Sequence, residues 1–383
     1  MMTIFLVVFI DLLGFGIILP LLPYIAEKYQ ATPVMIGILA GSYSLFQFIA
    51  GPILGRLSDR YGRKKLLIIS QLGSMAGYIL LGLATSLPLL FLSRIIDGIT
   101  GGNISIAQAY MADVTDHKTR AKGMGLLGAA FGLGFMLGPT IGGYLSTFGF
   151  AVPAYFAAGI AGLTTLATTL FLKETINTKV AQNSPKTAMT FQELKFVLST
   201  PPISTLVLTF FLLSLAFSGM QGTYALFVQA KFGWGPKEVG NIFGLIGITA
   251  IITQVKILPW FLLKFGERKT LASSVPILAL GFGLISVIKN IPLMMAANTL
   301  IPLGNSLANP TLTAIATESI PKEDYGETLG ILQSAGSLGH IFGPVVATEI
   351  FTYLGHNAPF QVSSLIFIIV SLFILPKITR PKS

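Results

Sequence analysis

Long apolar blocks separated by short polar loops dominate this chain of 383 residues. A bilayer-spanning helix needs about 20 predominantly apolar residues, and twelve such blocks can be placed along the sequence. The first six predicted spans are 3–25, 34–55, 66–86, 88–112, 122–146 and 151–172. The second six are 201–230, 236–262, 270–288, 291–317, 326–354 and 358–376. The pattern predicts an all-α membrane protein, with a polar linker at 173–200 between an N-terminal bundle (1–172) and a C-terminal bundle (201–383).

Composition agrees with a membrane location. Only 10% of the residues are charged and 53% are hydrophobic, whereas a soluble domain has about 25% charged residues. The net charge of +10 could indicate a nucleic-acid partner, but the charges lie in short loops, where membrane topology explains them. We therefore expect a lipid bilayer and no nucleic acid as partner. The absence of cysteine excludes thiolate catalysis, and three widely separated histidines give no reason to expect a metal site.

Lysine and arginine are distributed unevenly between alternate loops. If the N-terminus is cytoplasmic, the inner loops and the C-terminal tail carry 19 of these residues, and the outer loops carry Lys28, Lys231, Lys237 and Lys289. Positive charge concentrates on the cytoplasmic side of membrane proteins. Both termini are therefore predicted to be cytoplasmic. The protein is expected to be a multi-pass protein of a cell membrane, namely a bacterial inner or cytoplasmic membrane.

The two halves of the chain repeat each other. RYGRKKLL (60–67) aligns with KFGERKTL (264–271) at an offset of 204 residues, and the segment 113–139 matches 318–344 at an offset of 205. The matches fall in polar loops at a nearly constant offset, which favours a true repeat over the alternative, chance similarity among apolar helices. Parallel repeats of this kind place a binding site between the halves, near the bilayer midplane.

The loop after the second predicted span has the most specific composition in the chain. Its segment GRLSDRYGRKK, residues 55–65, combines one acid with five bases. Asp59 can pair with Arg63 or lie near the positive N-terminus of a neighbouring helix, so that the inner side is held closed in one state. A simple topology determinant is the alternative, but it does not need glycines at fixed positions. The predicted conformational latch consists of Gly55, Asp59, Arg60, Gly62, Arg63 and Lys64.

The same loop resembles the signature loop of the major facilitator superfamily. Four further segments are similar to motifs of its drug/proton antiporter branch, and of tetracycline and multidrug efflux proteins in particular: DLLGFGIILPLLP (11–23), SRIIDGITGG (93–102), GLGFMLGPTIGG (132–143) and KET (173–175). The resemblance covers all twelve predicted spans. It implies two six-helix bundles that work by alternating access, with protons as the coupling ion and no other cofactor.

Small residues form one face of the fifth predicted span. Glycines spaced by four allow helices to approach closely, and a proline bends a helix, so this face is expected to let the two halves slide against each other. Ordinary small-residue packing is the alternative, although Gly-Pro recurs at 343–344 in the other half. The predicted domain-interface motif consists of Gly134, Gly138, Pro139, Gly142 and Gly143.

Charged residues inside predicted spans are costly in hydrocarbon and must face a partner or water. Asp11 is the first candidate for a proton-carrying acid, because a partly buried acid can load and release a proton as its access alternates; a structural pairing role is the alternative. Arg94 and Asp97 lie three apart and share a helix face. Arg94 is expected to tune a nearby acid or to orient the substrate, or else to form an ion pair with Asp97 that only holds the span to its neighbours.

Candidates for a substrate cavity lie in the second half. Gln254 matches a glutamine of tetracycline exporters, but those proteins also have an acid in the ninth span, where this chain has none, so tetracycline specificity does not follow. Asn305 and Asn309 are four apart and either line the cavity or hold helices together, and His340 lies on the eleventh predicted span.

Taken together, these patterns predict a secondary transporter that exports a lipophilic or amphipathic small molecule, a drug for example, in exchange for protons, and that acts as a monomer. No GxxxxGK[ST] loop for ATP is present. A transporter of a metabolite, siderophore or lipid is the alternative, because the scarcity of intramembrane charges favours apolar cargo only modestly. A non-transporting receptor or an intramembrane enzyme fits less well, because the chain lacks a cluster of catalytic residues.

Overall fold

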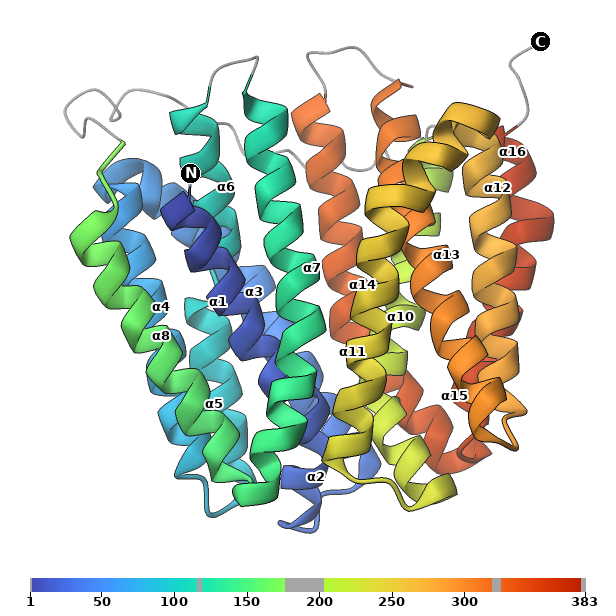
Figure 1. Ribbon diagram of the computed structural model, residues 1–383, viewed down its shortest axis with the longest axis horizontal. Coiled ribbons are helices and arrows are strands. Elements are labelled where there is room, and N and C mark those ends of the chain that lie inside the picture. Colours follow the sequence, from blue (N-terminus) through green and yellow to red (C-terminus); the bar gives the residue numbers. More distant parts are fainter. Residues whose placement is uncertain (1, 116–118, 176–202, 319–324, 380–383) are drawn as a thin grey trace. The chain divides into compact units, whose positions relative to one another are not determined.

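The computed structural model describes residues 2–115, 119–175, 203–318 and 325–379, which are almost entirely helical and contain no strand. The prediction of an all-α protein is confirmed for these residues (Figure 1). The predicted linker falls largely on 176–200, outside the described residues. Nine described helical stretches are long and apolar enough to cross a membrane.

The helix bounds follow the predicted spans closely. In the first half the helices are α1 (Met2–Ile18), α2 (Leu22–Glu27), α3 (Pro33–Tyr61), α4 (Arg63–Gly82), α5 (Leu87–Thr100), α6 (Asn103–Val114), α7 (Arg120–Leu145) and α8 (Ala151–Phe171). In the second half they are α10 (Ile203–Phe232), α11 (Pro236–Ile252), α12 (Leu258–Ser286), α13 (Ile291–Glu318), α14 (Tyr325–Leu354), α15 (Ala358–Ile369) and α16 (Leu375–Thr379).

Two compact units make up the chain. The first contains Met1–Pro185 and also Val228–Gly247, the end of α10 and most of α11. The second contains Lys186–Phe227 and Ile248–Ser383. The segment 228–247 therefore packs with helices from the first half of the sequence.

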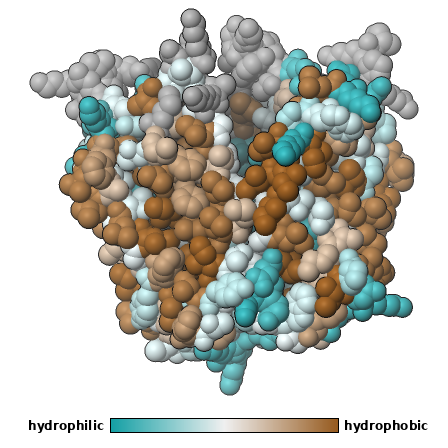
Figure 2. All heavy atoms as spheres, viewed as in Figure 1, coloured by the Kyte–Doolittle hydropathy of each residue, from teal (hydrophilic) through white to brown (hydrophobic). Residues whose placement is uncertain are grey.

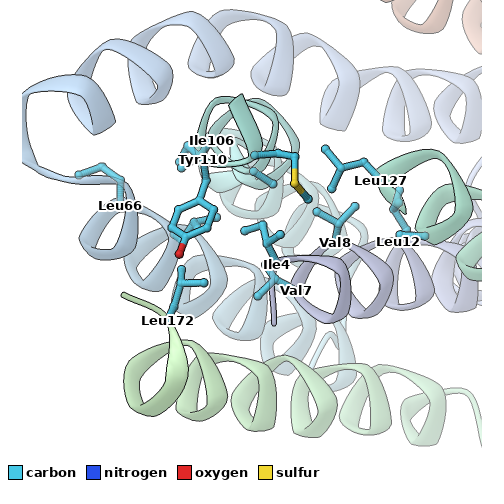
Figure 3. Packing of buried hydrophobic residues seen from close by; sticks show 13 residues of the cluster. Ile4, Val7, Val8, Leu12, Leu66, Ile106, Tyr110, Leu127 and Leu172 are labelled. Atoms are coloured by element: carbon cyan, nitrogen blue, oxygen red, sulfur yellow. The ribbon is translucent and has the colours of Figure 1, made fainter. Parts of the chain in front are cut away.

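Helix α1 lies at the centre of the first unit because it is apolar on all sides, which is typical of a buried helix. It packs against α6, α7 and α8. Its residues Ile4, Val7, Val8 and Leu12 point into a hydrophobic cluster with side chains from α4, α6 and α7 (Figure 3). This core holds in place the helices that carry the polar residues of the first half.

The fourth predicted span, 88–112, is not one continuous helix. It breaks at Gly101 and Gly102, so that α5 ends at Thr100 and α6 begins at Asn103. Consecutive glycines make a helix interior costly because glycine loses more conformational freedom on folding than any other residue. The break places a new helix N-terminus inside the span.

The second unit is built around α12, which packs against α13 and α15. Phe282 of α12 lies 5.3 Å, between ring centroids, from Phe367 of α15. The chain between Pro236 and Ser286 changes direction near Gly266, whose φ of 72° is in the region that favours glycine (Figure 1). This turn lies between the predicted spans 236–262 and 270–288.

Large apolar side chains are exposed along many helices. On α8, for instance, Leu163, Leu170 and Phe171 are each at least 65% exposed. Figure 2 shows hydrophobic residues over the middle of the helices and hydrophilic ones gathered towards their ends. Exposed apolar patches on this scale mark a surface that contacts something other than water, and lipid is the partner that the length of these helices requires.

Candidate functional site

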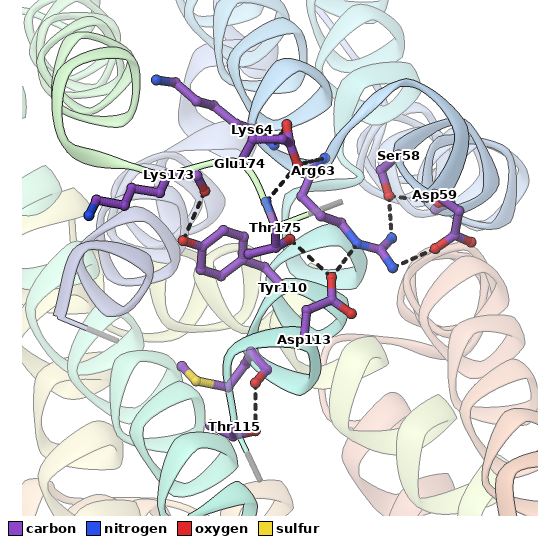
Figure 4. A network of polar contacts seen from close by, with 12 residues as sticks. Ser58, Asp59, Arg63, Lys64, Tyr110, Asp113, Thr115, Lys173, Glu174 and Thr175 are labelled. Carbon is purple, nitrogen blue, oxygen red and sulfur yellow. Dashed lines mark hydrogen bonds and ion pairs between the residues drawn. The ribbon is translucent and has the colours of Figure 1, made fainter. Parts of the chain in front are cut away.

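The predicted latch forms a charged network centred on Arg63, the first residue of α4 (Figure 4). The Arg63 guanidinium forms an ion pair with Asp59, donates from Nε to Asp113 Oδ2 at 3.0 Å and donates from Nη1 to Ser58 Oγ at 2.6 Å. The predicted pairing of Asp59 with Arg63 is therefore present. The Arg63 side chain is only 8% exposed, so its charge depends on these partners for compensation.

A second acid, Glu174, binds the N-terminus of α4. Its carboxylate accepts hydrogen bonds from the backbone N–H groups of Arg63, at 2.9 Å, and Lys64, at 3.1 Å. The first N–H groups of a helix have no partner within the helix and carry partial positive charge, so an acid there is stabilising. The Lys64 side chain donates from Nζ to the Thr169 carbonyl oxygen at 2.7 Å, which ties the loop to the end of α8.

Glycine is required at position 62 of the latch. Gly62 separates α3 from α4 with a φ of 104°, a conformation that residues with a Cβ rarely adopt. A Cβ there would also meet the Glu174 carboxylate. Gly55 has open space around it, and Arg60 is exposed, with its guanidinium 5.4 Å from the centre of the Tyr61 ring. Gly55 joins the network around Arg63 through its carbonyl oxygen, which accepts a hydrogen bond of 2.6 Å from Ser58 Oγ.

The glycines of α7 allow close approach to α1. A Cβ at Gly134 would lie 2.7 Å from the Leu12 Cβ, and one at Gly138 would lie 2.8 Å from the Leu13 carbonyl oxygen. Gly142 faces the Ile17 backbone in the same way. Three of the predicted motif glycines are thus needed for packing within the first half of the sequence.

The fourth motif glycine faces α11 instead. A Cβ at Gly143 would lie 2.7 Å from the Pro236 carbonyl oxygen, and the Thr140 hydroxyl donates to the Gly240 carbonyl oxygen at 3.2 Å. A Cβ at Gly240 would in turn meet the Pro139 backbone. Sequence reasoning did not identify this partner surface on α11. Its signal is a run of small residues at helical spacing, Gly240, Gly244 and Gly247.

Arg94 and Asp97 form a buried ion pair. Arg94 Nη1 lies 3.1 Å from Asp97 Oδ2, and both side chains are only 3% exposed. The predicted pairing of these two residues is therefore present. The Arg94 guanidinium carbon also lies 5.7 Å from the centre of the Tyr78 ring, and its Nη2 is buried with no hydrogen-bond partner among the described residues.

Asp11 lies in the same polar neighbourhood, although it is on a different helix. Its Oδ1 accepts a hydrogen bond of 2.7 Å from Asn103 Nδ2. Asp11 and Asp97 both interact electrostatically with the phenols of half-buried Tyr43 and buried Tyr78. The structure thus gathers the three predicted proton-coupling residues of the first half, and it adds Asn103, which sequence reasoning missed.

The cavity candidates of the second half are only partly brought together. Asn309 Nδ2 donates to Asn305 Oδ1 at 3.1 Å, and both residues are half-buried on α13. Gln254 is exposed on a π-helical segment, Thr253–Ile257, and His340 is exposed on α14. Within the described residues, no hydrogen bond or ion pair joins Gln254 or His340 to the two asparagines. A π-helical turn often marks a functional position in a helix, which keeps Gln254 a candidate.

The fold and the comparisons that follow indicate a transporter rather than an enzyme. The chain belongs to the Major Facilitator Superfamily, whose family model matches residues 4–258 and 206–383. It is a multi-pass cell-membrane protein, related to efflux proteins, and its family implies a small-molecule substrate.

Individual relatives cover nearly the whole chain. The class H tetracycline resistance protein of Pasteurella multocida is 31% identical, over 91% of this chain and 88% of that protein. Multidrug resistance protein 2 of Bacillus subtilis is 28% identical, over 94% and 91%. The solved structure of the human organic anion transporter MFSD10 is similar with a TM-score of 0.74 and 25% identity, over 98% of both chains.

Proposed function

We propose that this protein is a secondary active transporter that exports a lipophilic or amphipathic small molecule, such as a drug, in exchange for protons. The observation that carries the proposal is the group formed by half-buried Asp11 and the buried pair Arg94 and Asp97, in a chain similar to tetracycline and multidrug resistance proteins. Intramembrane acids are costly and mark proton or substrate pathways. A proton gradient is a sufficient driving force, since one charge crossing the membrane supplies about 2.3 kcal/mol per 100 mV.

The proposed topology has twelve spans in two six-helix bundles with both termini cytoplasmic. The described chain has nine apolar stretches. The long stretch Pro236–Ser286 counts as two crossings, α13 adds one, and the C-terminal helices α15 and α16 together add another, which makes twelve. The concentration of Lys and Arg in alternate loops supports the orientation. In this orientation the latch around Arg63 faces the cytoplasm, and α7 meets α11 near the outer side.

In the proposed cycle, the latch and the α7–α11 seam close in different states. The Arg63 contacts stabilise one arrangement of the inner loop, and the glycine seam allows the outer ends to pack without interlocking side chains. Proton loading at Asp11, beside Arg94 and Asp97, alternates with substrate binding. The protein acts as a monomer with no cofactor, and the proton is the coupling ion.

The proposed contacts for the substrate lie in the second half of the chain. Gln254, Asn305, Asn309 and His340 are the proposed polar contacts for the substrate. Because the ninth predicted span carries no acid, tetracycline is not the favoured cargo. A metabolite, siderophore or lipid is the alternative, and the experiment below distinguishes it by including such compounds.

Transport in sealed vesicles tests the proposal. Purified protein is placed in vesicles with an imposed pH gradient, and the flux of a panel of lipophilic cationic dyes, drugs, organic acids and lipids is followed. We expect gradient-driven flux of lipophilic or amphipathic compounds, and its loss in Asp11→Asn. Unchanged gradient-driven flux in Asp11→Asn would show that another group carries the proton.

A further inference from the structure

Asn103 is the residue that contacts the proposed proton carrier most directly. It is the first residue of α6, directly after the break at Gly101 and Gly102, and it is fully buried. Its Nδ2 donates to Asp11 Oδ1 at 2.7 Å across a sequence separation of 92 residues. A donor held this close to a carboxylate is worth more than an ordinary hydrogen bond, because bonds to ionised groups are about twice as strong as neutral ones.

The other end of the same amide has no partner. Asn103 Oδ1 is buried, and no hydrogen bond reaches it from any described residue. A buried polar atom without a partner is costly and needs an explanation. An amide beside a carboxyl group can serve both of its protonation states, since the amide has donors at one end and an acceptor at the other.

We propose that Asn103 is the positioning residue that sets the proton affinity of Asp11, a role that rests on the proposed proton coupling. When Asp11 is ionised, Asn103 Nδ2 donates to the carboxylate. When the coupling proton adds to a carboxylate oxygen, the new O–H group donates to Asn103 Oδ1, and no other bond forms or breaks. The first bond is charge-assisted and the second is neutral, so Asn103 favours the ionised acid while giving the neutral acid a partner.

The other charged and titratable groups near Asp11 come from neighbouring helices. They are Arg94 and Asp97 of α5, Tyr43 of α3 and Tyr78 of α4. Arg94 and Asp97 compensate each other at 3.1 Å, and the Tyr43 hydroxyl accepts a hydrogen bond from Gln47 Nε2.

The helices packed directly on α1 add few titratable groups, and those are engaged elsewhere. On α6, Tyr110 donates to the Lys173 carbonyl oxygen and Asp113 pairs with Arg63. Among the described side chains of α7 and α8 the titratable groups are Tyr144 and Tyr155. Tyr144 lies beneath Lys237. Asn103 is therefore the polar side chain through which these helices act on Asp11.

Infrared titration of the purified full-length protein in lipid vesicles tests this role without a known substrate. The carbonyl band of protonated carboxyl groups is followed against pH, and the difference between the parent protein and Asp11→Asn isolates the signal of Asp11. Asn103→Leu keeps a similar volume but removes both hydrogen bonds. We expect it to raise the pH midpoint of the Asp11 signal by about one unit, a tenfold change in proton affinity.

Two further variants keep the test decisive if Asn103→Leu folds poorly. Asn103→Ser has a hydroxyl too short to reach Asp11 and is expected to raise the midpoint as Leu does. Asn103→Gln keeps the amide and is expected to restore the parent midpoint, which a purely structural role would not require. Midpoints in Asn103→Leu and Asn103→Ser that equal the parent value, or lie below it, would overturn the assignment.

Vesicle flux separates this inference from the proposed function. If dye flux depends on the pH gradient and on Asp11 while the Asn103 variants leave the midpoint unchanged, the role of Asn103 is wrong and proton coupling stands. If the midpoint shifts as expected but no compound moves with the gradient, the proposed function is wrong and Asn103 still sets the proton affinity of Asp11.

Discussion

The seam between α7 and α11 leads to a prediction whose size follows from the structure. In Gly143→Ala, the new Cβ would lie 2.7 Å from the Pro236 carbonyl oxygen, and ordinary van der Waals contact begins at 3.4 Å. The obstacle is backbone, so one of the two helices must move. Adding a methylene to a well-packed site costs about 1–3 kcal/mol, which corresponds to a shift of about 5- to 150-fold away from the closed seam.

The assay uses the natural absence of cysteine. Because the chain has none, Thr140→Cys introduces a single thiol at the seam, where the Thr140 hydroxyl now contacts Gly240. The rate of reaction with a water-soluble thiol reagent reports how often the seam opens. In the Gly143→Ala background the labelling rate is expected to rise by about 5- to 150-fold. Dye flux is expected to fall because closure of the seam is disfavoured.

Gly128→Ala on the same helix is the matched control. Nothing lies within 4 Å of a Cβ built at Gly128. Gly128→Ala and Gly143→Ala both gain helix propensity, by about 1 kcal/mol at most. The difference between the two variants therefore isolates the steric effect at Pro236. Equal labelling rates in both variants would refute the idea that close packing at Gly143 sets the closure of the seam.

Three further variants test the polar networks. Glu174→Gln keeps the shape of the side chain but loses its charge at the α4 N-terminus, so we expect a loss of stability of about 1 kcal/mol, measured by thermal unfolding in detergent; an unchanged melting temperature would contradict the capping role. Arg94→Leu leaves Asp97 buried without compensation and is expected to destabilise the protein by about 3–5 kcal/mol, whereas the double variant with Asp97→Leu recovers most of that loss. If the double variant is stable and still transports dye with the pH gradient, the pair is structural only.

Contacts between residues close in sequence could be predicted from the chain. Arg94 and Asp97 lie nearly one turn apart on α5, so helical periodicity brings them together. Asp59 and Arg63 are four residues apart on either side of Gly62, so their contact also depends on the turn at that glycine. The glycines of α7 were recognisable because their spacing places them on one face. In each case the local backbone conformation determines the contact.

Contacts between distant segments could not be predicted in this way. Glu174 meets Arg63 across 111 residues, and Asn103 meets Asp11 across 92. Neither follows from periodicity, because both depend on how α1, α4, α6 and the end of α8 pack. The break at Gly101 was visible as a double glycine, but apolar residues on both sides of it made the fourth span look continuous.

The broken fourth span connects the two polar networks of the first half. Helix α6 begins with Asn103, which contacts Asp11, and near its end carries Asp113, which contacts Arg63 of the latch. These two residues are separated by about 15 Å along a helix that rises about 1.5 Å per residue. Two glycines interrupt the helix between α5 and α6, so α6 is a separate helical segment. On the proposed mechanism, a change in the Asp11–Asn103 bond that displaces α6 also displaces Asp113. Helix α6 therefore connects proton binding at Asp11 to the charged contacts of the latch.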